Sequence, residues 1–304
     1  MGDEEGHRAR CPVCSSHRVE FICHLPFATR RTPSSHASPP NDTDVYRCHA
    51  CGSYWRDGLD GVDLTSHFAN ASYTNPARER RLRALRWEFF EFLVQLGLGR
   101  LPVGKAPHVL DVGCSYGHLL QICHQRGCEC WGVELVGPLR ERINASAEAT
   151  VFADLRDVPS ELKFDLVFLI DSLYCFPRPM ELLSSVTELL DAGGFVVIRI
   201  ANRTPLLNLM VAFRMKDRIS SDLFGDQVVA FSHRGMENAI AATGLRVEQV
   251  LYYEHKSVSK RRRRLRLMYW FLPAVARMTG WRISPGLIYV CSRAASMYKT
   301  EESK

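Results

Sequence analysis

His108-Val-Leu-Asp-Val-Gly-Cys-Ser-Tyr-Gly117 is the stretch that decides the fold of this 304-residue chain. Three of residues 109–112 are apolar, which is the pattern of a short, buried parallel strand. Gly113 and Gly117 follow with three residues between them, and apolar residues then recur at helical spacing. A strand, a glycine turn and a helix in this order allow a ligand to approach the backbone at the carboxyl end of the strand.

The spacing of the glycines distinguishes this turn from the loops that bind phosphate. Those loops read Gly-x-Gly-x-x-Gly or end in Gly-Lys-Ser/Thr, whereas residues 111–117 read Asp-x-Gly-x-x-x-Gly. The pattern suits a ligand that combines an adenosine with a charged amino acid and carries no phosphate. Acidic residues at the ends of the following strands are therefore the next feature to examine.

Four further segments follow the glycine turn in the order that a doubly wound sheet requires. Glu134 closes the segment Cys-Trp-Gly-Val-Glu, and Asp154 lies in Val-Phe-Ala-Asp-Leu. Residues 164–171 form an apolar run that ends in an aspartate, and residues 190–194 read as the turn before a fifth strand. With the glycine turn, these landmarks extend over about ninety residues.

In this order the motifs resemble those of class I S-adenosylmethionine-dependent methyltransferases, with Ser115 where a middle glycine is more usual. The resemblance implies an α/β fold with a Rossmann-like, doubly wound, seven-stranded sheet whose last strand is antiparallel. It also implies that Glu134 accepts hydrogen bonds from the ribose and that Asp154 lies near the adenine. The residues expected to bind S-adenosylmethionine are Asp111, Gly113, Cys114, Gly117, Glu134, Asp154, Leu155 and Asp171.

Two Cys-x-x-Cys pairs near the N-terminus, Cys11 with Cys14 and Cys48 with Cys51, predict a metal site. Each pair can direct two thiolates at one ion, and two pairs complete a tetrahedral Zn²⁺ site. A closed Cys₄ site has no open position for a substrate, so we expect a structural zinc ribbon. Redox use of a pair is the alternative, although no thioredoxin-like unit accompanies it. Similar ribbons precede the catalytic domain in some bacterial small-molecule and sugar methyltransferases.

The predicted domains are a zinc ribbon, a linker with a capping helix, and a methyltransferase domain with two insertions. Their bounds are 1–57, 58–107 and 108–298, with the insertions at 202–231 and 254–285. The capping helix begins at Asn75-Pro76 and is amphipathic, and we expect its arginines to form a solvated basic face. Tyr73, just before it, is a further candidate for covering the cofactor. Residues 29–43, inside the ribbon, read as an extended loop.

Two residues are candidates for a direct part in catalysis. Tyr174 lies in the loop after the fourth predicted strand, where many relatives carry a Glu-His pair in place of Tyr174-Cys175. It can hydrogen-bond the substrate, or act as a base if its pKa is lowered. His233 follows Ser232 at the start of the last predicted helix and is a second candidate base. The alternatives are that Tyr174 only packs beside the cofactor and that His233 is a surface residue at the start of a helix that Ser232 caps.

The net charge of +6 is concentrated in one segment. Residues 254–285 contain nine Lys or Arg and one Glu, a charge of +8, so the remainder of the chain carries −2. The basic block 260–266 precedes an aromatic, apolar stretch that contains Pro273 and is too short to span a membrane. Residues 256–282 therefore fit a solvated charge run, an in-plane helix on an anionic membrane, or a nucleic-acid contact.

The predicted function is transfer of a methyl group to a small-molecule acceptor, with a sugar or a lipid-linked compound as the more specific expectation. Two alternatives remain open: an RNA or protein methyltransferase that docks through the ribbon and the basic run, and a degenerate fold that only binds. The acidic N-terminus has no secretory signal, and eleven cysteines without an export signal favour a reducing compartment. We expect a cytoplasmic protein without a transmembrane segment, and attachment to a membrane surface is the alternative.

Overall fold

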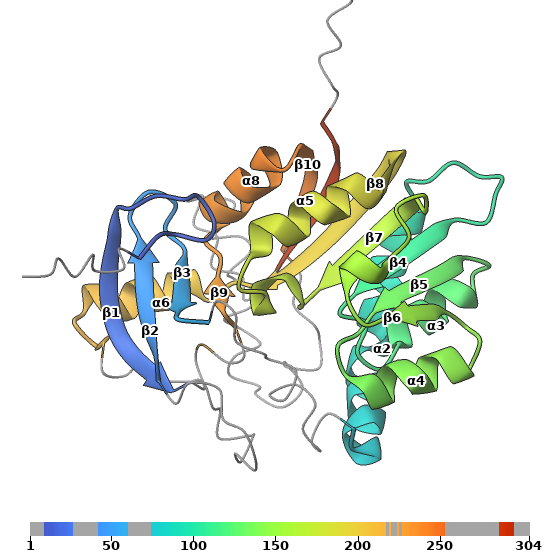
Figure 1. The fold of residues 1–304 in the computed structure, drawn as a ribbon, viewed down its shortest axis with the longest axis horizontal. Helices are drawn as coiled ribbons and strands as arrows, with labels where there is room; N and C mark the ends of the chain where they lie inside the picture. The colour runs from blue at the N-terminus through green and yellow to red at the C-terminus, as the bar shows by residue number, and fades with distance from the viewer. Residues whose placement is uncertain are drawn as a thin grey trace, which may run out of the picture.

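The computed structural model describes residues 9–26, 42–59, 74–216, 219, 224, 227–252 and 286–294. They form a seven-stranded sheet covered by helices and a smaller four-stranded sheet beside it (Figure 1). Three predicted features lie outside the described residues: most of the loop 29–43, Tyr73, and the basic run with its aromatic extension. Among the described residues, none of the helices combines the length and the apolar character needed to cross a bilayer.

The seven-stranded sheet has the strand order β10-β11-β8-β7-β4-β5-β6. The strands from β4 to β8 are parallel, and β11 lies antiparallel between β8 and β10. This is the doubly wound sheet with an antiparallel last strand that the motifs predict. Its strands are β4 (His108–Val112), β5 (Glu129–Val133), β6 (Thr150–Phe152), β7 (Phe164–Ile170), β8 (Leu190–Ala201), β10 (Leu245–Tyr252) and β11 (Gly286–Arg293).

The central strands are apolar along their length because helices bury both faces of the sheet. In β7, Leu166 and Phe168 pack on the face covered by the first helices, whereas Val167 and Leu169 pack on the opposite face. The helices are α2 (Pro76–Leu98) and α3 (His118–His124) on the first face, α5 (Pro179–Leu189) and α8 (His233–Ala242) on the second, and α4 (Gly137–Ala145) beside β6. Figure 1 shows α5 and α8 together on one side of the sheet.

One predicted boundary within this sheet is wrong. The sequence predicts a turn at residues 190–194 before the fifth strand, but these residues belong to β8, which starts at Leu190. The pairing of β7 with β8 contains an irregularity after Phe164, where Leu190 is its partner and Leu166 pairs with Phe195. The additional residues of β8 are accommodated by this bulge, so the glycines of the segment do not end the strand.

The smaller sheet, the ribbon sheet, consists of β1 (Val19–Pro26), β2 (Asp42–Cys48), β3 (Tyr54–Asp57) and β9 (Val229–Ala230). Strand β9 and the helix α6 (Thr204–Ala212) both come from the predicted insertion 202–231. Leu207 and Phe224 of this insertion share a small core with Tyr54 and other residues of the ribbon sheet. The N-terminal strands therefore complete their core with a segment that is more than 150 residues away in the sequence.

Backbone hydrogen bonds fasten the ribbon sheet to the large sheet. The Val228 N–H donates to the carbonyl of Tyr174 at 2.8 Å, and the Arg56 N–H donates to the carbonyl of Val228 at 2.8 Å. Ser232 caps α8 by accepting from Gly235 N–H at 2.8 Å, and its hydroxyl donates to the carbonyl of Cys51. The ribbon sheet is thus attached directly to the loop at the carboxyl end of β7.

Candidate active site

The glycine turn joins β4 to α3 through a run of left-handed backbone conformations. Gly113 has a φ of 83°, Ser115 of 52° and Gly117 of 75°. The N–H groups of Gly113 and Cys114 both donate to the carbonyl of Val133 at the end of β5, at 2.8 and 3.1 Å. Gly113 also lacks room for a side chain, because an added Cβ would lie 2.7 Å from the Cβ of Ser172. The turn therefore needs glycine for its conformation and for its packing.

Glu134, at the end of β5, is buried and holds this turn in place. One of its carboxylate oxygens accepts a hydrogen bond from Ser115 N–H and the other accepts from Val136 N–H, both at 2.8 Å. Burial raises the pKa of Glu134, and the two backbone donors act against that rise. A carboxylate oxygen has two lone pairs, so each can accept one further hydrogen bond from a ligand hydroxyl.

Asp111 occupies the penultimate position of β4 and is 4% exposed. Burial, with the nearby Glu134 as the second cause, raises the pKa of Asp111 to about 8. Two carboxyl groups beside one glycine turn make a site that favours a ligand carrying positive charge and hydroxyl groups. Cys114 lies between them as a buried thiol whose pKa burial raises well above its usual value, so it contributes apolar contact and no charge.

Asp154 and Leu155 follow β6 and begin the 3₁₀ helix η1 (Leu155–Asp157). The Asp154 carboxylate accepts two hydrogen bonds from the guanidinium of Arg156, at 2.9 and 2.8 Å, and it also caps η1. Its hydrogen bonds to Arg156 lower the pKa of Asp154, which remains ionised near the surface. Leu155 is 8% exposed and belongs to the main core. The cofactor role of both residues stays a prediction.

Asp171 comes directly after β7 and belongs to a cluster of charges. Its carboxylate accepts a hydrogen bond from Arg86 of α2 at 2.9 Å and another from Arg199 of β8. Burial tends to raise the pKa of Asp171, but Arg199 and Arg86 together hold it below its usual value. Asp171 has a φ of 59°, a conformation that aspartate adopts more readily than most residues. Its predicted cofactor contact is untested.

Tyr174 lies beside this cluster, whereas His233 begins α8 and packs on Tyr289, on the face of the sheet opposite to α2. Tyr174 is in the 3₁₀ helix η2 (Leu173–Cys175), and its hydroxyl group hydrogen-bonds Asp171. Burial, followed by the charge of Asp171, raises the pKa of Tyr174 well above its usual value, so the phenol stays protonated. His233 stacks on Tyr289, with 2.6 Å between Nδ1 and the Tyr289 hydroxyl, and its Nε2 lies 2.8 Å from Glu237. Both catalytic assignments remain predictions.

Three residues of this region were not found from the sequence: Arg86, Ser172 and Arg199. Ser172 is 7% exposed, and its hydroxyl has no hydrogen-bond partner in the part of the chain that the structure describes. Arg199 is the one charged residue in the apolar run 195–200, which is a detectable signal. The helix pattern predicts a solvated face for Arg86 and four other arginines, and nothing in that pattern separates Arg86 from the others.

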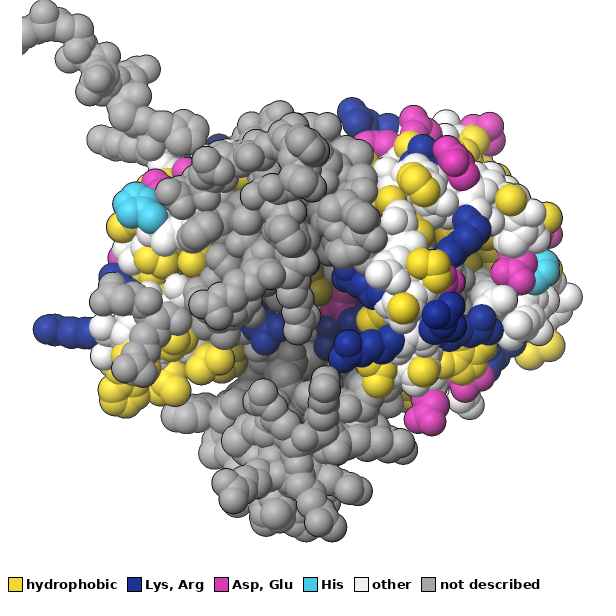
Figure 2. Space-filling model, turned by 90° about the horizontal axis from the view of Figure 1, so that it is seen from below, with side chains coloured by type: hydrophobic (Ala, Val, Ile, Leu, Met, Phe, Trp, Pro, Cys, Tyr) yellow, Lys and Arg dark blue, Asp and Glu magenta, His cyan; other side chains and the backbone are white. Residues whose placement is uncertain are grey.

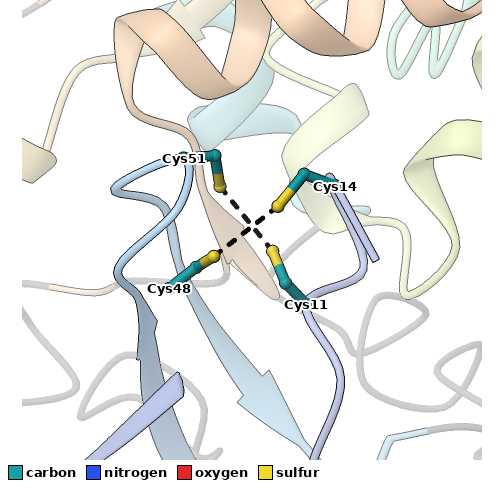
Figure 3. A group of neighbouring side chains, drawn as sticks. All are labelled: Cys11, Cys14, Cys48 and Cys51. Atoms are coloured by element: carbon teal, nitrogen blue, oxygen red, sulfur yellow. Dashed lines mark hydrogen bonds between the residues drawn. The ribbon is translucent and has the colours of Figure 1, made fainter. Parts of the chain in front are cut away.

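The four predicted zinc ligands come together in the ribbon (Figure 3). The sulfurs of Cys11, Cys14, Cys48 and Cys51 all lie within 4.8 Å of one another, and the Cys11–Cys51 and Cys14–Cys48 distances are 3.7 and 3.6 Å. A zinc ion with Zn–S bonds of about 2.3 Å places the sulfurs of a regular tetrahedron about 3.8 Å apart. The cluster therefore fits a tetrahedral zinc ion, and this confirms the predicted grouping of the cysteines.

The electrostatics of the cysteines also suit a cation. Hydrogen bonding with Cys51, followed by burial, raises the pKa of Cys11, whereas the same contact lowers the pKa of Cys51 to about 5. Burial raises the pKa of Cys14 to about 11. Four adjacent thiols cannot all ionise without a positive charge among them, and a bound metal ion supplies that charge.

Comparison with known families places residues 77–250 in a match to the family model described as a methyltransferase domain. Two curated relatives are both named ubiquinone biosynthesis O-methyltransferase. The one from Pseudomonas paraeruginosa is 30% identical over 105 residues, covering 32% of this chain and 45% of the relative. The one from Leptothrix cholodnii is 26% identical over 152 residues, covering 47% of this chain and 58% of the relative. The chain spans about half the length of the curated relatives it matches.

Among solved structures, a chain of the complex that contains the Haloferax volcanii Trm112 methyltransferase activator is similar to this protein. The two superpose with a TM-score of 0.53 at 16% identity, and the match covers 76% of this chain and 98% of that chain. At this identity the similarity establishes the shared fold. The match to the family model includes the glycine turn, Glu134, and the charge cluster around Asp171.

Proposed function

The chain belongs to the methyltransferase domain family, and from this premise we propose that it transfers a methyl group from S-adenosylmethionine to a small-molecule acceptor. The observation that carries the proposal is the buried Glu134, which fixes the glycine turn and retains acceptor capacity for hydroxyl groups. The curated relatives are named as O-methyltransferases, which supports a hydroxyl oxygen as the acceptor atom. A sugar or a lipid-linked acceptor is the more specific form of the proposal.

S-adenosylmethionine supplies a methyl group on a positively charged sulfur. In this chain, Glu134 would accept hydrogen bonds from the ribose hydroxyls, and the turn 113–117 would contact the amino-acid end. Asp111 would face positive charge, which stabilises its ionised form and lowers a pKa that burial raises to about 8. Proton release on cofactor binding at neutral pH is the corresponding expectation. Asp154 remains a candidate for contact with the adenine, and its carboxylate would then bind the adenine and Arg156 at the same time.

The protein's part in the reaction is to align the acceptor with the methyl carbon. The acceptor's lone pair forms the new bond, the electron pair of the broken carbon–sulfur bond stays on sulfur, and the acceptor's proton passes to water or to a base. Tyr174 is held protonated by burial and by Asp171, so we assign it as a hydrogen-bond donor and not as the base. His233 is held by Tyr289 and Glu237 and would have to leave them to accept a proton.

The cysteine cluster would hold one structural zinc ion, because its spacing matches a closed tetrahedral site. We propose that the ribbon 1–57 and the insertion 202–231 act as one unit attached to the methyltransferase domain 108–298. Strand β9 and the shared core around Tyr54 support this grouping. The unit would form the wall of the acceptor site that faces the carboxyl ends of β7 and β8. The roles of the basic residues 256–282 and of an anionic membrane stay predictions.

The cofactor assignment is tested by titrating the protein with S-adenosylhomocysteine in a calorimeter. We expect Glu134→Ala to weaken binding by about a hundredfold, since two hydrogen bonds to a charged group are worth roughly 3 kcal/mol. Glu129→Ala is the matched control, because Glu129 is an exposed acid at the other end of the same strand. Glu134→Gln keeps an acceptor for only one of the two backbone donors, so thermal unfolding of both Glu134 variants is measured alongside to separate weak binding from loss of the fold.

An unchanged dissociation constant in both Glu134 variants would remove the cofactor assignment. Absence of binding by the wild-type protein would favour the degenerate-fold alternative over an enzyme. If the cofactor binds, methyl transfer from labelled S-adenosylmethionine to fractionated cell extract identifies the acceptor. Label in the RNA or protein fraction, with none in the small-molecule fraction, would contradict the proposed acceptor class.

A further inference from the structure

Two arginines meet one aspartate at the carboxyl ends of β7 and β8. Arg86 reaches Asp171 from α2 at 2.9 Å, and Arg199 reaches it from the neighbouring strand. The strand order changes direction between β4 and β7, and ligands of open α/β sheets bind at such a switch point. The glycine turn after β4 occupies one half of this edge and the cluster lies in the other half, so Asp171 is assigned here to the acceptor and not, as the resemblance implies, to the cofactor.

The charges of this cluster do not cancel. Within the part of the chain that the structure describes, the two guanidinium groups and the one carboxylate of the cluster sum to a charge of +1, and Tyr174 is held as a neutral phenol. The side chain of Arg199 is 20% exposed and that of Asp171 is 9% exposed, so water can reach this charge only in part. A partly buried excess charge costs free energy unless a counter-charge accompanies it. A ligand anion is the group that would complete the cluster.

Two further observations point to a ligand at this place. Arg86 is 40% exposed in its side chain, and among the described residues it makes one hydrogen bond, to Asp171, so its other N–H groups are open to a ligand. Ser172, next to Asp171, has a buried hydroxyl without a partner in the described parts of the chain, and its side chain lies against Gly113, between the cluster and the glycine turn. Figure 2, seen from the side on which α2 projects, shows Lys and Arg side chains gathered near the middle of the molecule.

We propose that the methyl acceptor carries an oxyanion, a carboxylate or a phosphate, and that Arg86 and Arg199 bind it while Asp171 orients both guanidinium groups. This inference rests on the proposed function and specifies its substrate class. Arginine is suited to the role because its planar fork pairs with two oxygens at once. Tyr174 completes the arrangement by donating to Asp171, which keeps the carboxylate turned toward the arginines and away from the bound anion.

The experiment compares three small probes of similar shape: benzoate, phenyl phosphate and benzamide. Binding to the full-length, zinc-loaded protein is measured by ligand-observed NMR at constant ionic strength, with and without saturating S-adenosylhomocysteine. We expect at least one of the two anions to bind about tenfold or more tightly than the neutral amide. The two anionic arms separate a carboxylate site from a phosphate site.

Arg86→Gln and Arg83→Gln form the matched pair of variants. Both remove one positive charge from the same turn of α2, but Arg83 lies over the ring of Trp87 at 4.6 Å and not on Asp171. Arg86→Gln should lower anion affinity about tenfold and leave S-adenosylhomocysteine affinity unchanged, and Arg83→Gln should change anion affinity less than about twofold. Asp171→Asn leaves both arginines in place and tests whether Asp171 orients their guanidinium groups. It should weaken anion binding less than Arg86→Gln does.

Equal affinity for benzamide and both anions would overturn the inference, and so would equal losses in the two arginine variants. Failure of the wild-type protein to bind S-adenosylhomocysteine would contradict the proposed function instead. In that case the anion comparison without cofactor still decides the oxyanion site, so the two failures are distinguishable.

Discussion

The ribbon sheet and the seven-stranded sheet are each stabilised by different interactions. The central strands of the large sheet are buried on both faces, as in β7, where six of the seven residues are buried. The ribbon sheet has short strands, such as the four-residue β3 and the two-residue β9, and it takes part of its core from α6. Burial of apolar area therefore stabilises the large sheet, whereas the ribbon sheet completes its core with α6 and contains a cysteine cluster that fits a zinc ion.

The two sheets also have different roles under the proposed function. The large sheet supplies the glycine turn and the carboxylates at its edge, and a structure of this kind can position a cofactor without any metal. The ribbon sheet contacts the loop after β7 through Val228 and Tyr174, so it can influence the acceptor side. Under the proposed function, removal of the proposed zinc ion should therefore affect the acceptor side before it affects the cofactor side.

The largest expected effect comes from removing a zinc ligand. Cys48→Ser should abolish metal binding and lower the local stability of the ribbon sheet by several kcal/mol, since zinc binding contributes about 10 kcal/mol or more in small zinc domains. Metal content by mass spectrometry and amide hydrogen exchange in β1–β3 measure it. Cys23→Ser is the control, because Cys23 lies in β1 outside the cluster and should keep the metal. Fast exchange throughout β4–β8 in Cys48→Ser would show that the two sheets are not independent.

A smaller effect concerns how the free energy of unfolding of the large sheet depends on pH. The pKa of Asp111 is raised by burial to about 8, against about 3.9 in an unfolded chain. Between these values the folded state holds a proton that the unfolded state has lost, so the free energy of unfolding falls as the pH rises from about 4 to about 8. This fall in the free energy of unfolding, on the order of a few kcal/mol, should be absent in Asp111→Asn.

Denaturant unfolding of both proteins at pH 5 and pH 8 measures this difference, without cofactor. Identical pH dependence in the wild-type protein and in Asp111→Asn would show that Asp111 does not titrate in this range. Titration of the cysteine cluster in the ribbon sheet, with or without the proposed zinc ion, is the same in both proteins, so its pH dependence cancels in the comparison.

The smallest predicted effect separates packing from backbone conformation in the glycine turn. Gly113→Ala places a Cβ 2.7 Å from the Cβ of Ser172, whereas Gly127→Ala at a similar φ of 79° meets nothing within 4 Å. Both variants carry the cost of a left-handed alanine, about 1 kcal/mol, and Gly113→Ala should lose about 1–3 kcal/mol more through overpacking. Thermal unfolding measures the difference. Equal losses would mean that Ser172 moves aside freely.

Local patterns predicted those parts of the molecule in which neighbours in sequence are also neighbours in space. The apolar run before Gly113, the helix that starts at Pro76 and the two Cys-x-x-Cys pairs are of this kind, and the structure contains all three. The turn at 190–194 failed, because the glycines that suggest a turn are accommodated by a bulge in β8. Whether a glycine ends a strand depends on its partner strand, which the local sequence does not specify.

By itself the sequence determined the alternation of strands and helices, the glycine turn and the two Cys-x-x-Cys pairs, because periodicity and short spacings encode these features. The place of Glu134 beside the turn and the antiparallel last strand followed from the resemblance to class I methyltransferases. Only the tertiary structure decided that β9 joins the ribbon sheet and that Arg86, from 85 residues away, meets Asp171 beside Arg199. Such contacts arise when packing brings distant segments together. An arginine on the polar face of an amphipathic helix, such as Arg86, has the same local pattern whether it faces water or a buried partner.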